Sequence, residues 1–276
     1  MRIFFLVFTI LFICSSRIQA QSYSEWIESS FYYIEENKLD SAEMAVKNAL
    51  KSDPNNAINA FLLNNLGTLQ RRQRKLDDAL ESYSLALSRY PRNITFLLAR
   101  ASLFAEMGNL KNALIDYNVL LDEDLNNEEA LYQRGLLYVN LKDFELAEED
   151  FNRILTLSPH NLFAYLGKAT LYKVQGRYAD AEKMYNYLEE KEPDYSGIFA
   201  GRAELFLLLG KGNKALTDIN KAIRFSQNKE DPYVYIIRAK AKLLLLEKQS
   251  AAEDIEKAIS LGYDKQEAEY LLGFTK

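Results

Sequence analysis

The sequence has very little of the residue types that carry reactive or metal-binding chemistry. Its 276 residues include one Cys and one His, and its 5 Pro and 11 Gly are too few for a sandwich built from many tight turns. With 48% apolar and 26% charged residues, the composition is nevertheless that of a folding chain. These shortages favour an all-helical protein, as one large domain or two ordinary ones.

Residues 1–20 have the composition of a secretory signal peptide. Arg2 precedes the apolar run IFFLVFTILFIC, which is too short to span a bilayer comfortably, and SSRIQA ends at a small residue. We predict cleavage after Ala20 and an exported protein that is periplasmic or secreted. The alternative is a lipoprotein with lipid on Cys14, although the bacterial lipobox requires a small residue where Ile13 stands.

Cleavage after Ala20 would remove Cys14, the only Cys. Disulfides, Cys nucleophiles and thiolate metal sites are then excluded from the mature chain. The 34 basic residues fall to 32 without Arg2 and Arg17, against 39 acidic ones, so the net charge changes from −5 to −7. This balance makes nucleic acid an unlikely partner, and membrane contact is expected only if Cys14 is lipidated.

The mature chain repeats itself with a period of 34 residues. Insertions of three residues (57–59) and two residues (230–231) interrupt an otherwise continuous register. The seven units are 23–56, 60–93, 94–127, 128–161, 162–195, 196–229 and 232–265.

Two columns of these units contain only small residues. The eighth place holds Ser30, Gly67, Ala101, Gly135, Ala169, Ala203 and Ala239. The twentieth place holds Ala42, Ala79, Ala113, Ala147, Ala181, Ala215 and Ala251. We interpret these columns as the contact between two helices of each unit, because helices approach closely only where small residues meet.

Large apolar residues recur at the fourth, eleventh, seventeenth and twenty-fourth places, the stripe of an amphipathic helix. Turn-prone pairs such as Gly108-Asn109 separate the two halves of a unit, and Pro54, Pro91, Pro159 and Pro193 mark unit ends. Because one unit cannot bury its stripe alone, we expect the units to stack.

This pattern resembles the tetratricopeptide repeat family over residues 23–265. The residues that carry the match are Trp26, Leu66-Gly67, Gly135, Tyr138, Ala147, Phe151 and Pro159. The resemblance implies an all-α fold, a right-handed superhelical solenoid of antiparallel helix pairs. We predict a single solenoid domain over 21–276, with seven units and a capping helix at 266–274.

Arg recurs at the seventh place and Asp at the twenty-third place of the same four units: Arg100 with Asp116, Arg134 with Asp150, Arg202 with Asp218 and Arg238 with Asp254. Pairing each Arg with the preceding unit's Asp would account for only two of the four. We therefore predict ion pairs within each unit that join its helices, each contributing about 0–1 kcal/mol if exposed. The alternative is two independently solvated charges.

In tetratricopeptide proteins the first helices of successive units line a concave groove. The resemblance places candidate partner-binding residues at Phe61, Asn64, Asn65, Thr68 and Arg71, at Thr95, Leu98 and Ser102, at Tyr132 and Leu136, and at Phe163, Leu166, Thr170 and Lys173. Apolar and aromatic surface interleaved with amides and hydroxyls suits an extended peptide or a helix.

No set of nucleophile, base and oxyanion donor converges in the sequence, and His160 is expected to be a solvated turn residue. We therefore predict a non-catalytic scaffold without metal or cofactor, which binds a partner protein or peptide within an envelope or secretory assembly. One alternative is a lipid-anchored assembly or chaperone factor at a membrane surface. The other is a carbohydrate-binding or hydrolytic module.

Overall fold

A computed structural model describes residues 22–226 and 231–273, and within these two ranges all regular structure is α-helical. This confirms the predicted fold class of consecutive helix pairs. The predicted signal peptide with Cys14, the residues 227–230 and Phe274 lie outside the described residues.

Contacts within the chain define two compact units, of which the first ends at Glu123 and the second begins at Asp124. This boundary falls close to the end of the third repeat. The first compact unit contains three helix pairs: α2 (Tyr23–Glu35) with α3 (Leu39–Ser52), α4 (Asn59–Arg72) with α5 (Leu76–Arg89), and α6 (Ile94–Glu106) with α7 (Leu110–Glu123).

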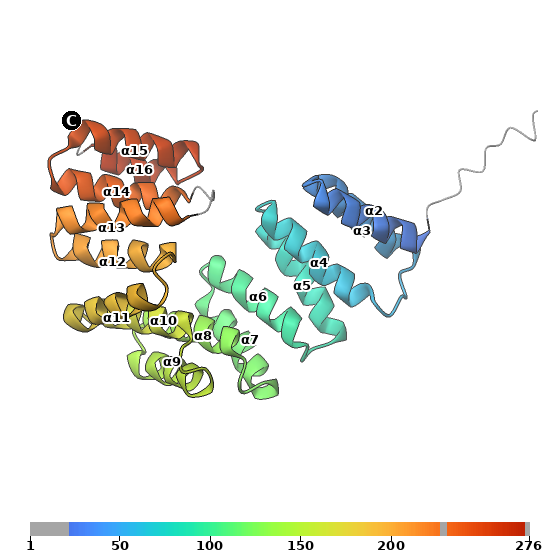
Figure 1. Ribbon diagram of the computed structural model, residues 1–276. Helices are drawn as coiled ribbons and strands as arrows, with labels where there is room; N and C mark the ends of the chain where they lie inside the picture. Colours follow the sequence, from blue (N-terminus) through green and yellow to red (C-terminus); the bar gives the residue numbers. More distant parts are fainter. Residues whose placement is uncertain (1–21, 227–230, 274–276) are drawn as a thin grey trace, which may run out of the picture. The chain divides into compact units, whose positions relative to one another are not determined.

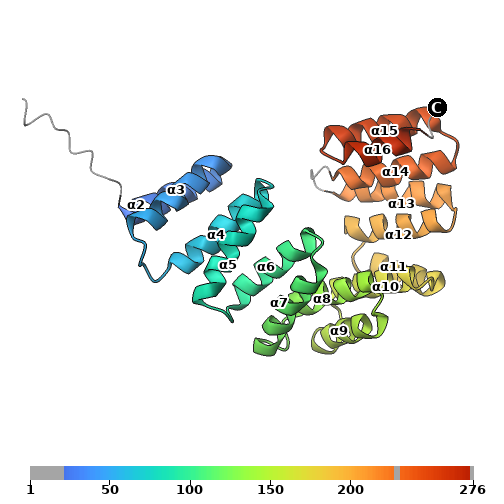
Figure 2. The same cartoon turned by 180° about the vertical axis from the view of Figure 1, so that it is seen from behind.

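The second compact unit contains four further pairs and a short last helix (Figure 1). These are α8 (Glu128–Leu141) with α9 (Phe144–Leu157), α10 (Leu162–Val174) with α11 (Tyr178–Lys191), α12 (Ser196–Leu208) with α13 (Gly212–Phe225), α14 (Pro232–Leu244) with α15 (Lys248–Ser260), and α16 (Lys265–Leu272). The helices α12 to α15 lie side by side from both directions of view (Figure 2). The prediction of one continuous solenoid domain over 21–276 stays a prediction.

Within each pair the helices meet at the two columns of small residues. The Ala residues of the twentieth place are all fully buried, and the residues of the eighth place are buried as well. Repeat four shows why a Gly can be needed there: a Cβ on Gly135 would lie 2.6 Å from Cε1 of Phe151. A Cβ on Gly167, in the next pair, would lie 2.5 Å from the same atom. The ring of Phe151 therefore fills the space that two glycines leave.

Each turn between the helices of a pair passes through a residue with positive φ at the fifteenth place. Gly fills this position in three repeats, at Gly108, Gly176 and Gly210. The other four repeats have Asn37, Arg74, Lys142 and Leu246, with φ between 54° and 64°. Gly adopts this left-handed conformation without the steric cost that a Cβ brings. Asn also tolerates this conformation, so the unfavourable residues are the three others, Arg74, Lys142 and Leu246.

Candidate functional site

The first helices of the first compact unit carry eight of the candidate residues. Asn65 and Thr95 are exposed and Leu98 is half-buried, while Phe61 is 49% exposed. The Phe61 ring packs against Phe96 at 5.2 Å and against Tyr90 at 6.0 Å between centroids. Phe61, Tyr90 and Phe96 therefore form an aromatic cluster near the beginning of α4, and one side of the Phe61 ring is exposed.

Polar candidates in this compact unit differ in whether they already have a partner. Arg71 donates to Glu106 on the next first helix, with 2.6 Å between Nε and Oε2. In contrast, the side-chain oxygen of Asn64 is buried and has no hydrogen-bond partner among the described residues. A buried polar atom without a partner is costly, and a ligand can satisfy it. Asn64 is therefore the polar candidate here that is best suited to bind a ligand.

The first helices of the second compact unit carry the other six candidates. Tyr132 packs between Phe151 and Phe163, with ring centroids 6.2 and 5.7 Å away. Phe163 also meets Tyr195 edge-on at 6.3 Å, yet it remains 47% exposed. Leu136 and Leu166 are half-buried. Tyr132, Phe163 and Tyr195 therefore form an aromatic row at the beginnings of α8, α10 and α12, with the buried Phe151 ring behind Tyr132.

A hollow of about 340 Å³ opens beside these rings. It is lined by Glu128, Glu129, Tyr132, Gln133, Asn161 and Phe163. Glu128 is already engaged, because Ser158 and Asn161 donate to its two carboxylate oxygens at 2.6 and 2.7 Å. Glu129 is exposed and faces solvent. The hollow thus offers an aromatic wall with one available carboxylate, a combination that suits a peptide side chain.

Two hydroxyl candidates of the ninth place contact Tyr residues of their second helices. Thr68 and Ser102 lie 3.1 and 3.2 Å from the hydroxyls of Tyr83 and Tyr117. Thr170 occupies the same place relative to Tyr185 and lowers the pKa of that phenol, and all three Tyr side chains are buried. In repeat four, Leu136 occupies the ninth place and Phe151 replaces the Tyr. A hydroxyl at the ninth place thus occurs with a Tyr at the twenty-fourth place, and a Leu occurs with a Phe. This pairing gives these hydroxyls a structural role.

Burial raises the pKa of both Tyr83 and Tyr185 above the ordinary value. The hydrogen bonds from Thr68 and Thr170 act in the opposite direction and lower it. Neither phenol can therefore serve as a proton acceptor near neutral pH, and a catalytic use of this row of Tyr residues has no support.

The four Arg–Asp pairs are all present within their own repeats. In each pair the Arg Nε and Nη2 atoms donate to both carboxylate oxygens of the Asp, at distances from 2.5 to 3.0 Å. The Asp side chains are buried and the Arg side chains are only partly exposed. These pairs are therefore less exposed than the sequence-based estimate assumed. Removing one partner from such a pair strands a buried charge.

A second contact of these Arg residues was missed in the sequence. Arg202 Nη1 also donates to Asn186 of the preceding repeat at 2.7 Å, and Arg100 donates to Ser84 at 3.3 Å. Lys168, which replaces Arg in repeat five, donates to Asn152 at 2.7 Å. The acceptors share the twenty-fifth place, where Asn118, Asn152, Asn186 and Asn220 recur. That column of Asn was the available signal, and the seventh place therefore links repeats as well as helices.

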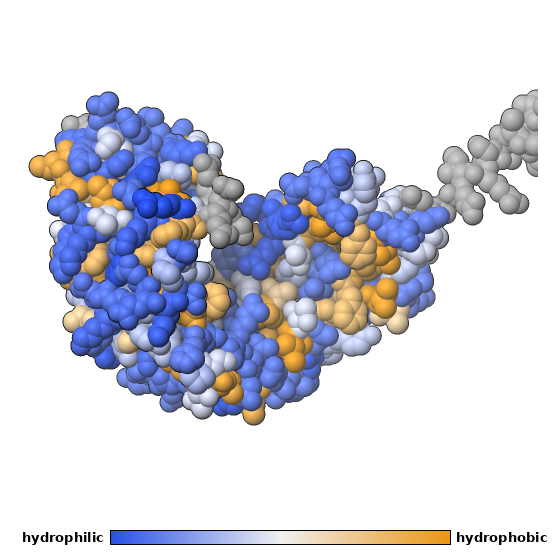
Figure 3. Space-filling view, viewed as in Figure 1, coloured by the Kyte–Doolittle hydropathy of each residue, from blue (hydrophilic) through white to orange (hydrophobic). Residues whose placement is uncertain are grey.

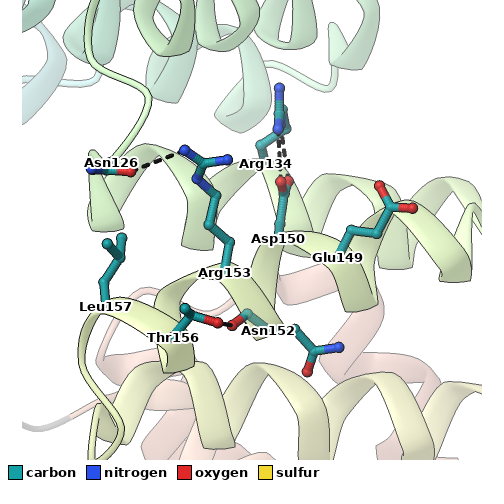
Figure 4. A pocket seen from close by; sticks show the side chains of 8 residues that line it. All are labelled: Asn126, Arg134, Glu149, Asp150, Asn152, Arg153, Thr156 and Leu157. Carbon is teal, nitrogen blue, oxygen red and sulfur yellow. Dashed lines mark hydrogen bonds and ion pairs between the residues drawn. The ribbon is translucent and has the colours of Figure 1, made fainter.

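The surroundings of Arg134 and Asp150 form a hollow of about 600 Å³ on the second-helix side of repeat four (Figure 4). Arg134 points at Asp150, and Arg153 donates to Asn126 at 3.0 Å (Figure 4). Burial raises the pKa of Asp150, although the hydrogen bonds and charge of Arg134 oppose this shift. Arg134 and Asp150 thus engage each other, and we assign this hollow to the structure of the repeat.

A further surface in repeats five to seven was also missed, because the groove positions were carried over only as far as repeat five. A hollow of about 360 Å³ there is lined by Lys173, Glu204, Leu207, Leu208, Tyr233, Ile237 and Lys240. Glu204 accepts a hydrogen bond from Lys173. Counting the places of Phe163, Thr170 and Lys173 into α12 and α14 would have given Tyr233, Glu204, Lys240 and Leu207 in the sequence, whereas Leu208 lies one place further on.

Two other properties bear on the kind of site. The described ranges contain no cluster of three or more His, Cys, Asp or Glu side chains that could hold a metal ion. Among the same residues, no helix is both long and apolar enough to cross a membrane. His160 lies exposed in the loop after α9.

Comparison with known proteins gives three findings. Profiles of the tetratricopeptide repeat match residues 128–161 and residues 64–128 and 166–232. A search of curated proteins finds no match. Among solved structures, a tetratricopeptide repeat protein from Parabacteroides merdae ATCC 43184 is 44% identical, with a TM-score of 0.83 over 92% of this chain and 99% of that chain.

More distant structures share the fold alone. Yeast Tom70 is 20% identical over 86% of this chain and 52% of its own, with a TM-score of 0.68. PilW, described as a type IV pilus biogenesis factor, is 18% identical over 79% of this chain and 98% of its own, with a TM-score of 0.60.

Proposed function

The chain belongs to the tetratricopeptide repeat family, and we propose that it is an exported, non-catalytic scaffold that binds a peptide segment of a partner protein on the first-helix faces of its two compact units. The family's fold suggests a role in protein–protein interaction. The observation that carries the proposal is the exposed aromatic surface around Phe163, which borders a hollow with one available carboxylate.

The chemistry of this surface favours a peptide. Tyr132 and Phe163 offer flat apolar area, and aromatic residues are enriched in the cores of protein interfaces. In the first compact unit, Phe61 provides a similar exposed ring and Asn64 an amide oxygen that could accept a backbone N–H. Hydrolysis of a glycoside usually needs two facing carboxylates, whereas here Ser158 and Asn161 hold the Glu128 carboxylate.

Site-specific crosslinking tests the binding face. A photoreactive phenylalanine analogue would replace Phe163 in one variant and Leu146 in another, and both variants would be expressed in the native host. Leu146 is the matched control, because it is similarly exposed but lies on the second helix α9. We expect a discrete crosslinked partner from position 163 that is absent from position 146. Equal crosslinking from both positions, or none from position 163, would contradict the proposal.

Mass spectrometry of the mature amino terminus tests export. The pattern of residues 1–20 supports cleavage after Ala20, which would leave Gln21 as the first residue. A diacylated Cys14 would instead support the lipid-anchored alternative. Retention of the uncleaved segment would contradict both versions.

A further inference from the structure

Large leucines gather on the surface where α12 and α14 end. This leucine surface consists of Leu207, Leu208, Leu243, Leu244 and Leu246. Leu208 is 60%, Leu244 49% and Leu246 81% exposed. Apolar surface gathers at the turn from α14 to α15 (Figure 3). Single exposed leucines need no explanation, but a contiguous group of them marks an interaction site.

Two hollows divide this surface, and Lys240 lines both. The first is the hollow of about 360 Å³ described above, on the side of Tyr233 and Ile237. The second, of about 440 Å³, is lined by Leu207, Lys240, Leu243, Leu244, Leu246 and Lys248. Leu207 and Lys240 are common to the two. The surface therefore offers an apolar hollow and a partly apolar one, and Lys240 places a cationic group at both.

Lys240 differs from the other lysines of the first helices in this compact unit. Lys168 pairs with Glu148, Lys173 with Glu204, and Lys242 with Asp254. No carboxylate among the described residues forms an ion pair with Lys240. Glu204, which lines the same hollow, is engaged by Lys173. Lys240 is thus a half-buried cation beside apolar surface without an anionic partner.

We propose that the leucine surface binds an amphipathic segment of a partner protein that carries two large apolar side chains with a carboxylate between them. The apolar side chains occupy the two hollows, and the carboxylate pairs with Lys240. Charge complementarity selects this partner chemistry, since an apolar segment without an acid would leave the Lys240 ammonium desolvated and unpaired. The inference rests on the proposed role in protein binding and adds the chemistry of the bound segment on the first helices of repeats six and seven.

The test is selection from a phage-displayed library of random twelve-residue peptides on the mature chain. Each enriched peptide is then measured by fluorescence anisotropy against variants. We expect peptides with two large apolar residues around an Asp or Glu, whose binding weakens about tenfold or more with Lys240→Glu or Leu244→Asp. Lys240→Arg should keep most of the affinity, and added salt should weaken binding by screening the charge pair.

Controls separate this proposal from the other possible outcomes. Leu146→Asp places the same charge on a similarly exposed leucine outside the surface and should leave binding unchanged. Peptides that respond only to Phe163→Ala report on the binding face proposed above, so the two proposals can fail independently. Enriched peptides without a carboxylate, or without sensitivity to Lys240→Glu, would overturn the inference. A concentration-dependent dimer that Leu244→Asp dissociates would also overturn it, in favour of a second copy of the chain.

Discussion

Repeats four (128–161) and five (162–195) both consist of two helices joined by a turn, but different side chains hold the two helices together. Repeat four joins its helices by the buried pair of Arg134 and Asp150 and places Leu136 over Phe151. In repeat five, Lys168 bonds Glu148 and Asn152 of the preceding repeat, and Met184 stands where the Asp would be.

The other coupled places differ as well. Repeat five has Ala169 at the eighth place, Thr170 and Tyr185 at the ninth and twenty-fourth places, and Gly176 in the turn. Repeat four has Gly135 and Lys142 at the corresponding eighth and fifteenth places. The comparison teaches that places in contact with each other within a repeat change together. The role of a residue therefore depends on the residue that it contacts, and a substitution that changes only one of the two should lower the stability most.

The largest effect should come from separating the charge pair of repeat four. Arg134→Met leaves the Asp150 carboxylate buried without its main partner, which should lower the free energy of unfolding by about 3–5 kcal/mol. Lys168→Met in repeat five should cost about 1 kcal/mol or less, because its in-repeat neighbour is the uncharged Met184. Urea denaturation followed by circular dichroism measures both. Equal losses in the two repeats would contradict the buried-pair explanation.

Two further measurements sharpen this result. The double variant Arg134→Met with Asp150→Leu removes the stranded charge and should recover much of the lost stability. Burial raises the pKa of Asp150, so its carboxylate binds a proton more readily in the folded chain than in the unfolded one. Its contribution to stability is present below the ordinary carboxyl pKa and lost as pH rises through the raised one. The cost of Arg134→Met should therefore be smaller near pH 4 than at pH 7.

The next effect concerns the eighth place. Gly135→Ala should destabilise by about 1–3 kcal/mol, because the new Cβ would overlap the Phe151 ring. Helix propensity alone predicts the opposite sign, a gain of up to about 1 kcal/mol. The matched change in repeat five, Ala169→Gly, removes a methyl group and should cost about 1 kcal/mol. Thermal unfolding decides the sign, and a rise in Tm for Gly135→Ala would disprove the close contact.

A smaller effect is expected at the ninth place. Thr170→Val removes the hydroxyl that interacts with the Tyr185 phenol and should cost up to about 1 kcal/mol. Adding Tyr185→Phe removes the stranded hydroxyl and reproduces the apolar solution of repeat four, so the double variant should be close to wild type. A double-mutant cycle by urea denaturation measures this coupling. Additive losses would show that Thr170 and Tyr185 act independently.

The smallest effect is in the turns. Lys142→Gly should stabilise repeat four by about 0.5–1 kcal/mol, since Gly accepts the positive φ of 64° without a steric cost. Gly176→Lys in repeat five should destabilise by a similar amount. Differential scanning calorimetry of the two variants should show Tm shifts of opposite sign. Shifts in the same direction would mean that side-chain contacts outweigh the backbone preference.

Much of the fold could be predicted because its signals are periodic. The Ala column of the twentieth place set the phase, and Pro54, Pro91, Pro159 and Pro193 all lie just beyond helix ends. The partner of each Arg also followed from the repeats, since only the Asp of the same unit is always present with it. Counting over seven units supplied information that one repeat lacks.

The remaining features depend on contacts that do not recur from repeat to repeat, so the sequence shows no pattern for them. Thr68, Ser102 and Thr170 were carried over to the groove from the places of the family, and the sequence did not indicate that Thr68 and Ser102 also hydrogen-bond a Tyr of the second helix. The left-handed conformation of Lys142 and Leu246 is imposed by the helix pairing and opposes their own preference. Leu208, Leu244 and Leu246 lie outside the groove places, and they were missed because an exposed leucine and a buried one look alike in a helical stripe.

Arg202 has a consequence that extends beyond its own repeat, because one guanidinium holds both Asp218 and the preceding repeat's Asn186. Unfolding of solenoids is described by an intrinsic stability for each repeat and a coupling between neighbours. Here one side chain contributes to both quantities. When the helices of its repeat separate, the contact with the preceding repeat is therefore lost in the same event. Fraying from the end of the stack should therefore advance by whole repeats, with few half-open forms along the way.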